Sequence, residues 1–241
     1  MKCKALIISI KGTKLSKKEK LLLSKERPWG IILFKRNLKS FKQIKKLTSE
    51  IKKFTKNKKF PILIDEEGEI VSRLSYIINH NITSNFFGKL YIIDKNLCLK
   101  IIKYYINSLS KLLKNLGINI NTIPVLDVLR TRTNKIIGNR SFSNNKKIVK
   151  ELGKLIIKHL HSNRISGVIK HIPGHGAAVS DSHLKMPRVG LSFKKLNEID
   201  FYPFKFSNAK FAMTAHILYS KYDKFNVATF SKKIIKNVIR Q

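Results

Sequence analysis

Short apolar runs alternate with amphipathic segments along almost the whole chain, and this alternation limits the folds that the chain can adopt. The apolar runs have the length of buried strands, and the segments between them repeat apolar residues at helical spacing. Strands that alternate with helices form a parallel sheet, because each helix returns the chain to the start of the next strand. The sequence predicts strands at residues 5–10, 30–34, 61–64, 118–125, 167–170 and 211–215, and helices at 16–25, 41–54, 94–116, 146–161 and 231–240.

Polar side chains follow four of the predicted strands directly. They are Asp65, Asp127, the pair Lys170 and His171, and His216. Functional sites of α/β proteins lie at the carboxyl ends of parallel strands, in open doubly wound sheets and in (β/α)₈ barrels alike. Polar residues after several successive strands are typical of the barrel, although the periodicity by itself also allows the open sheet.

The segment KHIPGHGAAVSDSH, from Lys170 to His183, carries the densest group of ionisable side chains. Pro173, Gly174 and Gly176 exclude a helix, so the segment is predicted to be a loop after the fifth strand. Its ionisable side chains are Lys170, His171, His175, Asp181 and His183. We therefore expect the functional site of the chain at this loop.

Three interpretations of this loop compete. A zinc site would use His171 and His175, which stand four residues apart, but that spacing needs a helix to bring both rings to one face. A structural role suits His175, which lies between two glycines and can bond backbone groups of a tight loop. An acid/base role suits Asp181 and His183: side chains at i and i+2 of an extended segment point the same way, and the carboxylate can hold the imidazole tautomer and raise its pKa.

The charge of the chain does not predict a specific nucleic-acid reader. The formal net charge is +36, but only 9 of the 50 basic residues are arginine, the residue on which base recognition depends most. The lysines are spread along every predicted helix, a pattern that we interpret as compositional drift in an AT-rich genome. Weak, salt-sensitive binding to polyanions is still expected from such a charge.

The remaining composition is that of one soluble domain. A length of 241 residues suits a single large α/β domain over residues 1–241. Cys3 and Cys98 have neither a disulfide framework nor metal-ligand spacing, which favours a reducing compartment. The apolar run at 5–10 is too short for a signal sequence, and no run approaches the length of a membrane span. The expected location is the cytoplasm, with no membrane partner.

Six segments together resemble the bacterial β-N-acetylglucosaminidases of glycoside hydrolase family 3. Besides the KHIPGHG and DSH parts of the loop, Asp65–Arg73 is similar to the family pattern DQEGG-R-V-x-R. The other similar segments are residues 28–37, residues 121–128 (N-x-x-PVLDV in the family), residues 137–142 (IG-x-RSF) and residues 213–216. The resemblance extends over nearly the whole chain and implies a (β/α)₈ TIM barrel.

The resemblance also implies a substrate and a mechanism. The enzyme would remove terminal N-acetylglucosamine from muropeptides during peptidoglycan recycling, by a retaining mechanism, as a monomer with no metal or organic cofactor. By resemblance the sugar is bound by Asp65, Arg73, Arg140, Lys170 and His171, and the acid/base dyad is Asp181 with His183. The alternative for Asp65, Arg73 and Arg140 is an ordinary ion-pair network, and Asp127 is interpreted as a structural strand-end carboxylate.

Two departures from the family pattern change these expectations. Glu69 and Ile70 stand where the family has glycine and arginine. The chain also stops at Gln241, before the seventh strand that carries the family's aspartate nucleophile, so we expect a truncated barrel that lacks about the last two βα units and has two open sheet edges. The alternatives are a catalytically inactive sugar-binding remnant and, with less support, a basic nucleic-acid-binding protein.

Overall fold

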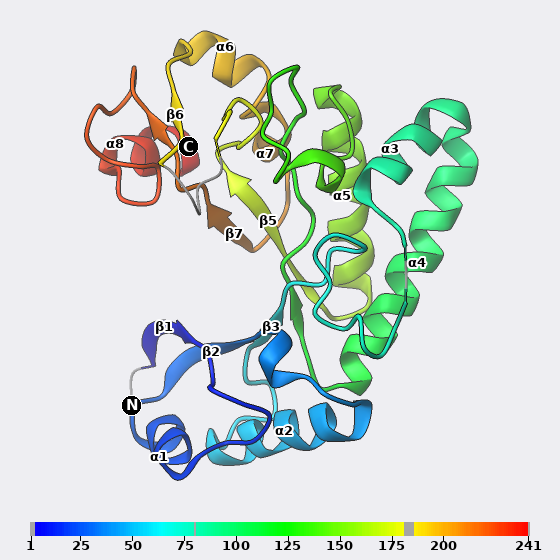
Figure 1. The fold of residues 1–241 in the computed structure, drawn as a ribbon, viewed down its shortest axis with the longest axis vertical. Helices are drawn as coiled ribbons and strands as arrows, with labels where there is room; N and C mark the ends of the chain where they lie inside the picture. Colours follow the sequence, from blue (N-terminus) through cyan, green and yellow to red (C-terminus); the bar gives the residue numbers. More distant parts are fainter. Residues whose placement is uncertain (1–2, 80, 181–185, 241) are drawn as a thin grey trace.

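The computed structural model describes residues 3–79, 81–180 and 186–240, and its centre is a curled six-stranded parallel sheet (Figure 1). The strands, in their order across the sheet, are β1 (Lys4–Ile8), β2 (Pro28–Leu33), β3 (Ile62–Ile64), β4 (Ile120–Asn121), β5 (Ser166–Ile172) and β7 (Phe211–Thr214). The six strands follow one another across the sheet in chain order, whereas the strand order of a doubly wound sheet reverses at a switch point. The expected barrel architecture, in partial form, is confirmed.

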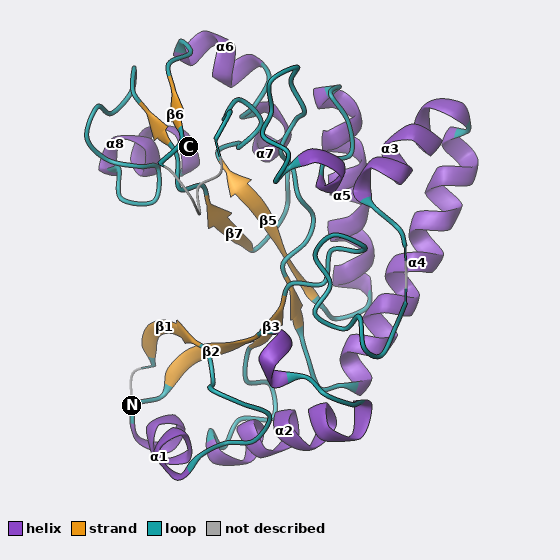
Figure 2. Ribbon diagram, viewed as in Figure 1, coloured by secondary structure: helices purple, strands orange, loops and turns teal. Residues whose placement is uncertain are grey.

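The longer helices cover the outer face of the sheet (Figure 2). The helices are α1 (Lys17–Lys25), α2 (Phe41–Phe54), α3 (Ser84–Ile93), α4 (Lys95–Asn115), α5 (Lys146–Ser162), α6 (Phe193–Glu198), α7 (Tyr202–Lys205) and α8 (Lys232–Ile234). Of these, α6 and α8 pack in a separate apolar cluster that includes Val189 and Tyr219. A π-helical turn, Ile235–Ile239, follows α8, and two 3₁₀ turns lie at Lys35–Asn37 and Gly138–Arg140. Capping side chains fix where two of the helices begin. Ser16 and Glu19 form a capping box at the N-terminus of α1, and Asp94 accepts the Leu97 N–H at the N-terminus of α4.

The structure differs from the predicted elements in three helices, one strand pair and the length of the fourth strand. The helices α3, α6 and α7 were not predicted, and neither was the separate parallel pair of β6 (Arg188–Val189) and β8 (Leu218–Tyr219). The fourth strand is also much shorter than predicted. Pro124 has no N–H to donate to a ladder, so only an isolated bridge between Val125 and Lys170 continues the pairing beyond β4.

The main core lies between the sheet and its helices. Amphipathic faces of α2, α4 and α5 bury their apolar residues against the strands. A smaller cluster fills the inside of the curl: Leu63, Ile120 and Val168 pack together, and the rings of Trp29 and Phe211 meet edge to face at 5.3 Å. This contact joins β2 to β7 across the curl, so the sheet is held in its curved shape from within.

The two end strands of the sheet are β1 and β7. Among the described residues, no strand pairs with the outer side of either. Leu6 and Ile7 of β1 are 55% and 50% exposed, which is high for apolar residues in a strand. The open sheet edges that the truncated barrel predicts are therefore present in the described structure.

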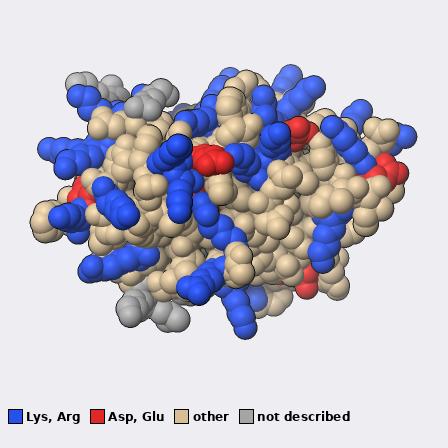
Figure 3. Space-filling view, turned by 90° about the horizontal axis from the view of Figure 1, so that it is seen from above, with Lys and Arg blue, Asp and Glu red and all other residues tan. Residues whose placement is uncertain are grey.

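The surface carries the large excess of positive charge. Lys and Arg side chains are distributed over the whole face seen in Figure 3, with apolar and neutral stretches between them, and they do not gather into one stripe. Within the described ranges, no helix is both long enough and apolar enough to cross a membrane.

Candidate active site

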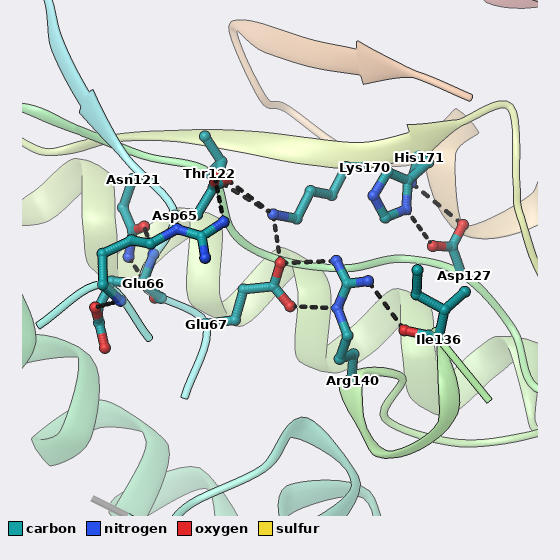
Figure 4. A network of polar contacts seen from close by, with 11 residues as sticks. Asp65, Glu66, Glu67, Asn121, Thr122, Asp127, Ile136, Arg140, Lys170 and His171 are labelled. Carbon is teal, nitrogen blue, oxygen red and sulfur yellow. Dashed lines mark hydrogen bonds and ion pairs between the residues drawn. The ribbon is translucent and has the colours of Figure 1, made fainter. Parts of the chain in front are cut away.

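The residues predicted to bind substrate come together at the carboxyl ends of three neighbouring strands (Figure 4). Asp65 follows β3 directly, Thr122 follows β4, and Lys170 and His171 belong to the last residues of β5. Arg140 reaches the same place from the 3₁₀ turn Gly138–Arg140. Parallel pairing of β3, β4 and β5 aligns these strand ends, so residues that are about a hundred positions apart in sequence become neighbours.

Lys170 is the central cation of the site. Its side chain is only 2% exposed, and its Nζ lies 2.5 Å from Glu67 Oε1 and 3.4 Å from Asp65 Oδ1. The same ammonium group donates to Thr122 Oγ1 at 3.0 Å. A buried ammonium needs such partners, because burial of an unpaired charge is very costly.

Glu67 links Lys170 to Arg140. The Arg140 guanidinium donates to both carboxylate oxygens of Glu67, through Nε at 2.8 Å and through one Nη at 2.9 Å, and its other Nη donates to the Ile136 carbonyl at 3.0 Å. This two-bond contact fixes the plane of the guanidinium. Sequence reasoning did not select Glu67, although it stands inside the DQEGG-like segment two residues after Asp65.

Asp65 is held by Arg73 and Thr122. Arg73 Nη2 lies 3.3 Å from Asp65 Oδ2, and the Thr122 hydroxyl donates to Asp65 Oδ1. Burial favours a higher pKa for Asp65, but Lys170, Thr122 and Arg73 outweigh it and lower the pKa. Burial is likewise outweighed at Glu67, where Lys170 and Arg140 lower the pKa. Both carboxylates are therefore ionised at neutral pH.

Asp65 and Glu67 are the carboxylates that pair with the side chains of Lys170, Arg140 and Arg73. The neighbouring carboxylate of Glu66 instead accepts the backbone N–H groups of Arg73 and Leu74. Arg73 Nε is buried without a partner among the described residues. Such a site offers hydrogen-bond donors to the oxygens of a neutral polar ligand, and Asp65 adds an acceptor.

Asp127 organises a second group beside this network. Its carboxylate is fully buried and accepts from His171 Nδ1 at 2.7 Å, from the His171 N–H at 3.2 Å and from the His175 N–H at 2.6 Å. Burial favours a higher pKa for Asp127, but its two histidine partners outweigh it and lower the pKa. Burial of His175 itself lowers the pKa of that ring.

The metal interpretation of this group finds no support in the described residues. Nowhere in the described ranges do three or more His, Cys, Asp or Glu side chains stand close enough to hold a metal ion. The rings of His171 and His175 contact each other edge to face, with centroids 5.6 Å apart, and Asp127 binds the backbone N–H of His175 rather than its ring.

The loop after β5 is anchored by its backbone. Tyr219 donates its hydroxyl to the Gly174 carbonyl at 2.5 Å, Thr133 donates to the Gly176 carbonyl at 2.6 Å, and the Asn134 N–H donates to the Ala178 carbonyl at 3.0 Å. The described part of the loop ends at Ser180. The predicted dyad of Asp181 and His183 lies outside the described residues, so its geometry stays a prediction.

Three further residues singled out in the sequence lie outside the Lys170 network. Glu69 and Ile70, which depart from the family pattern, line a small hollow beside Glu67 and Arg140. His216 follows β7 and contacts the Thr229 hydroxyl at 2.7 Å through Nδ1, in an exposed position.

Comparison with known proteins identifies the family of this chain. The family model for the glycosyl hydrolase family 3 N-terminal domain matches residues 2–241. The chain belongs to glycosyl hydrolase family 3.

Several β-hexosaminidases are similar to this family 3 chain. It is 33% identical over 241 residues to β-hexosaminidase A of Pseudoalteromonas piscicida, a match that covers 91% of this chain and 40% of that protein. It is 32% identical over 236 residues to the β-hexosaminidase of Neisseria meningitidis, covering 96% of this chain and 64% of that protein. The chain therefore spans less than two thirds of the length of these curated relatives.

Solved structures agree with this assignment. Native NagZ from Neisseria gonorrhoeae superposes with a TM-score of 0.90 at 31% identity, over 98% of this chain and 70% of that one. The same enzyme in complex with N-trifluoroacetyl-D-glucosamine gives a TM-score of 0.91 at 31% identity, over 99% of this chain and 72% of that one. The family 3 chain thus has the fold of these relatives along its full described length.

Proposed function

We propose that the chain is, by descent, a β-N-acetylglucosaminidase that removes terminal N-acetylglucosamine from muropeptides. The single observation that carries the proposal is the buried network around Lys170. It presents several hydrogen-bond donors and one strand-end carboxylate at the carboxyl ends of the strands, where barrel enzymes bind their substrates. The relation to β-hexosaminidases, and a relative's complex with a glucosamine derivative, support the choice of sugar.

Each binding residue has a defined task in this proposal. Arg140 and Arg73 donate to hydroxyl and acetyl oxygens through N–H groups that their protein partners leave free, and Asp65 accepts from a sugar hydroxyl. The three N–H groups of Lys170 already contact Glu67, Asp65 and Thr122, so Lys170 donates to a sugar oxygen in place of its longest contact, with Asp65 at 3.4 Å. Asp65 can take a further bond because an ionised carboxylate has about four acceptor positions, and Thr122, Lys170 and Arg73 use three of them. His171 completes the set beside Lys170 (Figure 4).

The chemical step is assigned to Asp181 and His183. His183 protonates the leaving oxygen and then takes a proton from the attacking water, while Asp181 holds the ring in the required tautomer. A retaining glycosidase also needs a carboxylate nucleophile. Sugar binding without hydrolysis is the second candidate function, because the proposed binding groups lie within the described ranges while the chain spans 64% of its meningococcal relative.

Hydrolysis and binding are measured on the same purified chain to separate the two candidates. A chromogenic N-acetylglucosaminide reports turnover, and calorimetry with N-acetylglucosamine reports binding. The variants are His183→Ala for catalysis and Asp65→Asn for binding, with the exposed α5 residue His161→Ala as the matched control.

Turnover that His183→Ala abolishes and His161→Ala leaves intact supports the hydrolase. Binding without turnover, lost in Asp65→Asn, supports a sugar-binding protein. A folded chain that shows no binding and no turnover contradicts the proposed function.

A further inference from the structure

Asp127 controls the orientation of His171. Its carboxylate Oδ2 meets the ring Nδ1, and its Oδ1 accepts the backbone N–H groups of His171 and His175. The backbone of Asp127 is held in turn, because the Ser141 hydroxyl donates to its carbonyl at 2.5 Å. Both the position and the rotation of the His171 ring are therefore fixed from the buried side.

The other side of the ring faces the sugar-binding network. In Figure 4 the His171 ring lies between Asp127 and Lys170. Among the described residues, no hydrogen bond is made by Nε2, and the side chain is 17% exposed, so the ring is not closed off from solvent. Nδ1 faces the carboxylate, and Nε2 faces the site.

The chemistry of Asp127 decides which nitrogen carries the hydrogen. An ionised carboxylate is only an acceptor, so the ring Nδ1 must be the donor in their bond. In the neutral ring the hydrogen then sits on Nδ1, and Nε2 keeps a free electron pair. Lys170 and Arg140 can only donate, which makes His171 Nε2 an acceptor among donors.

We propose that Asp127 is a positioning residue that holds neutral His171 in the Nδ1–H tautomer, so that the site selects a sugar hydroxyl which donates its hydrogen to Nε2. A hydroxyl at that point can donate its hydrogen to His171 Nε2. A fluorine or methoxy group cannot donate, so the pair of residues distinguishes a hydroxyl from these groups. The choice of sugar rests on the proposed function, whereas the tautomer does not.

The first test reads the tautomer directly by ¹⁵N NMR of the imidazole rings, recorded at alkaline pH. His171→Ala identifies the signals among those of the seven histidines. In the wild type we expect a protonated Nδ1. In Asp127→Asn the amide oxygen can still accept the two backbone N–H groups, but the amide NH₂ donates to Nδ1, so the hydrogen moves to Nε2.

The control for this test is Asp94→Asn, which changes an exposed helix cap far from any histidine of the site in sequence and leaves the tautomer unchanged. A wild-type His171 that carries its hydrogen on Nε2 overturns the proposal, even when Asp127→Asn does not fold.

The second test measures ligand selection with N-acetylglucosamine and its single deoxyfluoro analogues. For the wild type we expect one position at which fluorine weakens binding by about tenfold, the loss of one good hydrogen bond. In Asp127→Asn the neutral ring presents Nε2–H, so fluorine at that same position no longer carries this penalty.

Equal losses for every analogue in both proteins overturn the selection part of the proposal. A wild-type chain that shows the Nδ1–H tautomer but does not bind N-acetylglucosamine contradicts the proposed function and leaves the role of Asp127 toward His171 in place. The two failures are thus distinguishable.

Discussion

Glu67 is the residue on which the charge balance of the site depends most. Its carboxylate contacts Lys170 and makes both bonds to Arg140, and all three side chains are largely buried. In Glu67→Gln two cations lose their shared anion, and breaking a buried pair in this way costs about 3–5 kcal/mol of the free energy of unfolding. Urea denaturation measures the change.

Glu50→Gln is the matched control for Glu67→Gln. Glu50 pairs with Lys20 at 2.7 Å on the surface, where both side chains are partly exposed. Loss of a surface pair costs about 0–1 kcal/mol. Similar losses in the two variants contradict the view that Glu67 compensates buried charge.

His175 makes the stability of the chain sensitive to mild acid. Burial lowers the pKa of the folded ring below the ordinary histidine value of 6.5, so the unfolded chain binds a proton more readily than the folded one. This contribution to stability is fully present above the unfolded pKa and is lost as the pH falls from about 6.5 toward the lower folded value.

Urea midpoints between pH 8 and pH 5 test this expectation. The wild type loses stability over that range, and His175→Gln has a shallower slope. His161→Gln, at an exposed position, keeps the wild-type slope. A His175→Gln slope equal to that of the wild type contradicts the prediction. The further loss expected from Asp65 and Glu67, whose pKa values are lowered, begins only below the ordinary carboxyl pKa values of 3.8 and 4.5.

At the scale of elements, the loop after β5 depends on close approach to the segment after β4. A Cβ added at Gly176 would lie 1.8 Å from the Val128 carbonyl oxygen, so Gly176→Ala forces the loop away from this segment. We expect a loss of about 1–3 kcal/mol in stability, as for other overpacked sites, together with weaker sugar binding.

Gly12→Ala is the control for the loop variant, because no described atom comes within 4 Å of its added Cβ. Thermal unfolding and calorimetry with N-acetylglucosamine are compared for both variants. Unchanged stability and binding in Gly176→Ala would show that the loop tolerates a larger separation from Val128.

For the whole molecule, the net charge of +36 predicts polyanion binding without sequence preference. Lysines spread over the surface neutralise phosphates and release counterions, so the affinity falls steeply with salt (Figure 3). Fluorescence anisotropy with two unrelated DNA duplexes, at low and at physiological salt, is the measurement. Sequence-dependent binding that persists at physiological salt contradicts this expectation and supports the nucleic-acid alternative.

Elements with a strong periodic pattern were predictable. The helix expected at residues 41–54 is α2, Phe41–Phe54, because its apolar residues all lie on one face and Ser40 caps it. Helix α3 was not predicted, since it is apolar on most sides and has no polar stripe to define its period. β4 was overestimated because an apolar run does not show which N–H groups find a partner, and Pro124 has none.

The amino-acid sequence by itself determined the parallel α/β architecture and the positions of Asp65, Arg140, Lys170 and His171 at strand ends and in the family's turn. These depend on local periodicity and on short motifs. Only the tertiary structure decided that Glu67 joins Lys170 to Arg140 and that Asp127 sets the direction of His171. Such contacts join residues from different strand ends, and their strength comes from burial, which exists only once the sheet has formed.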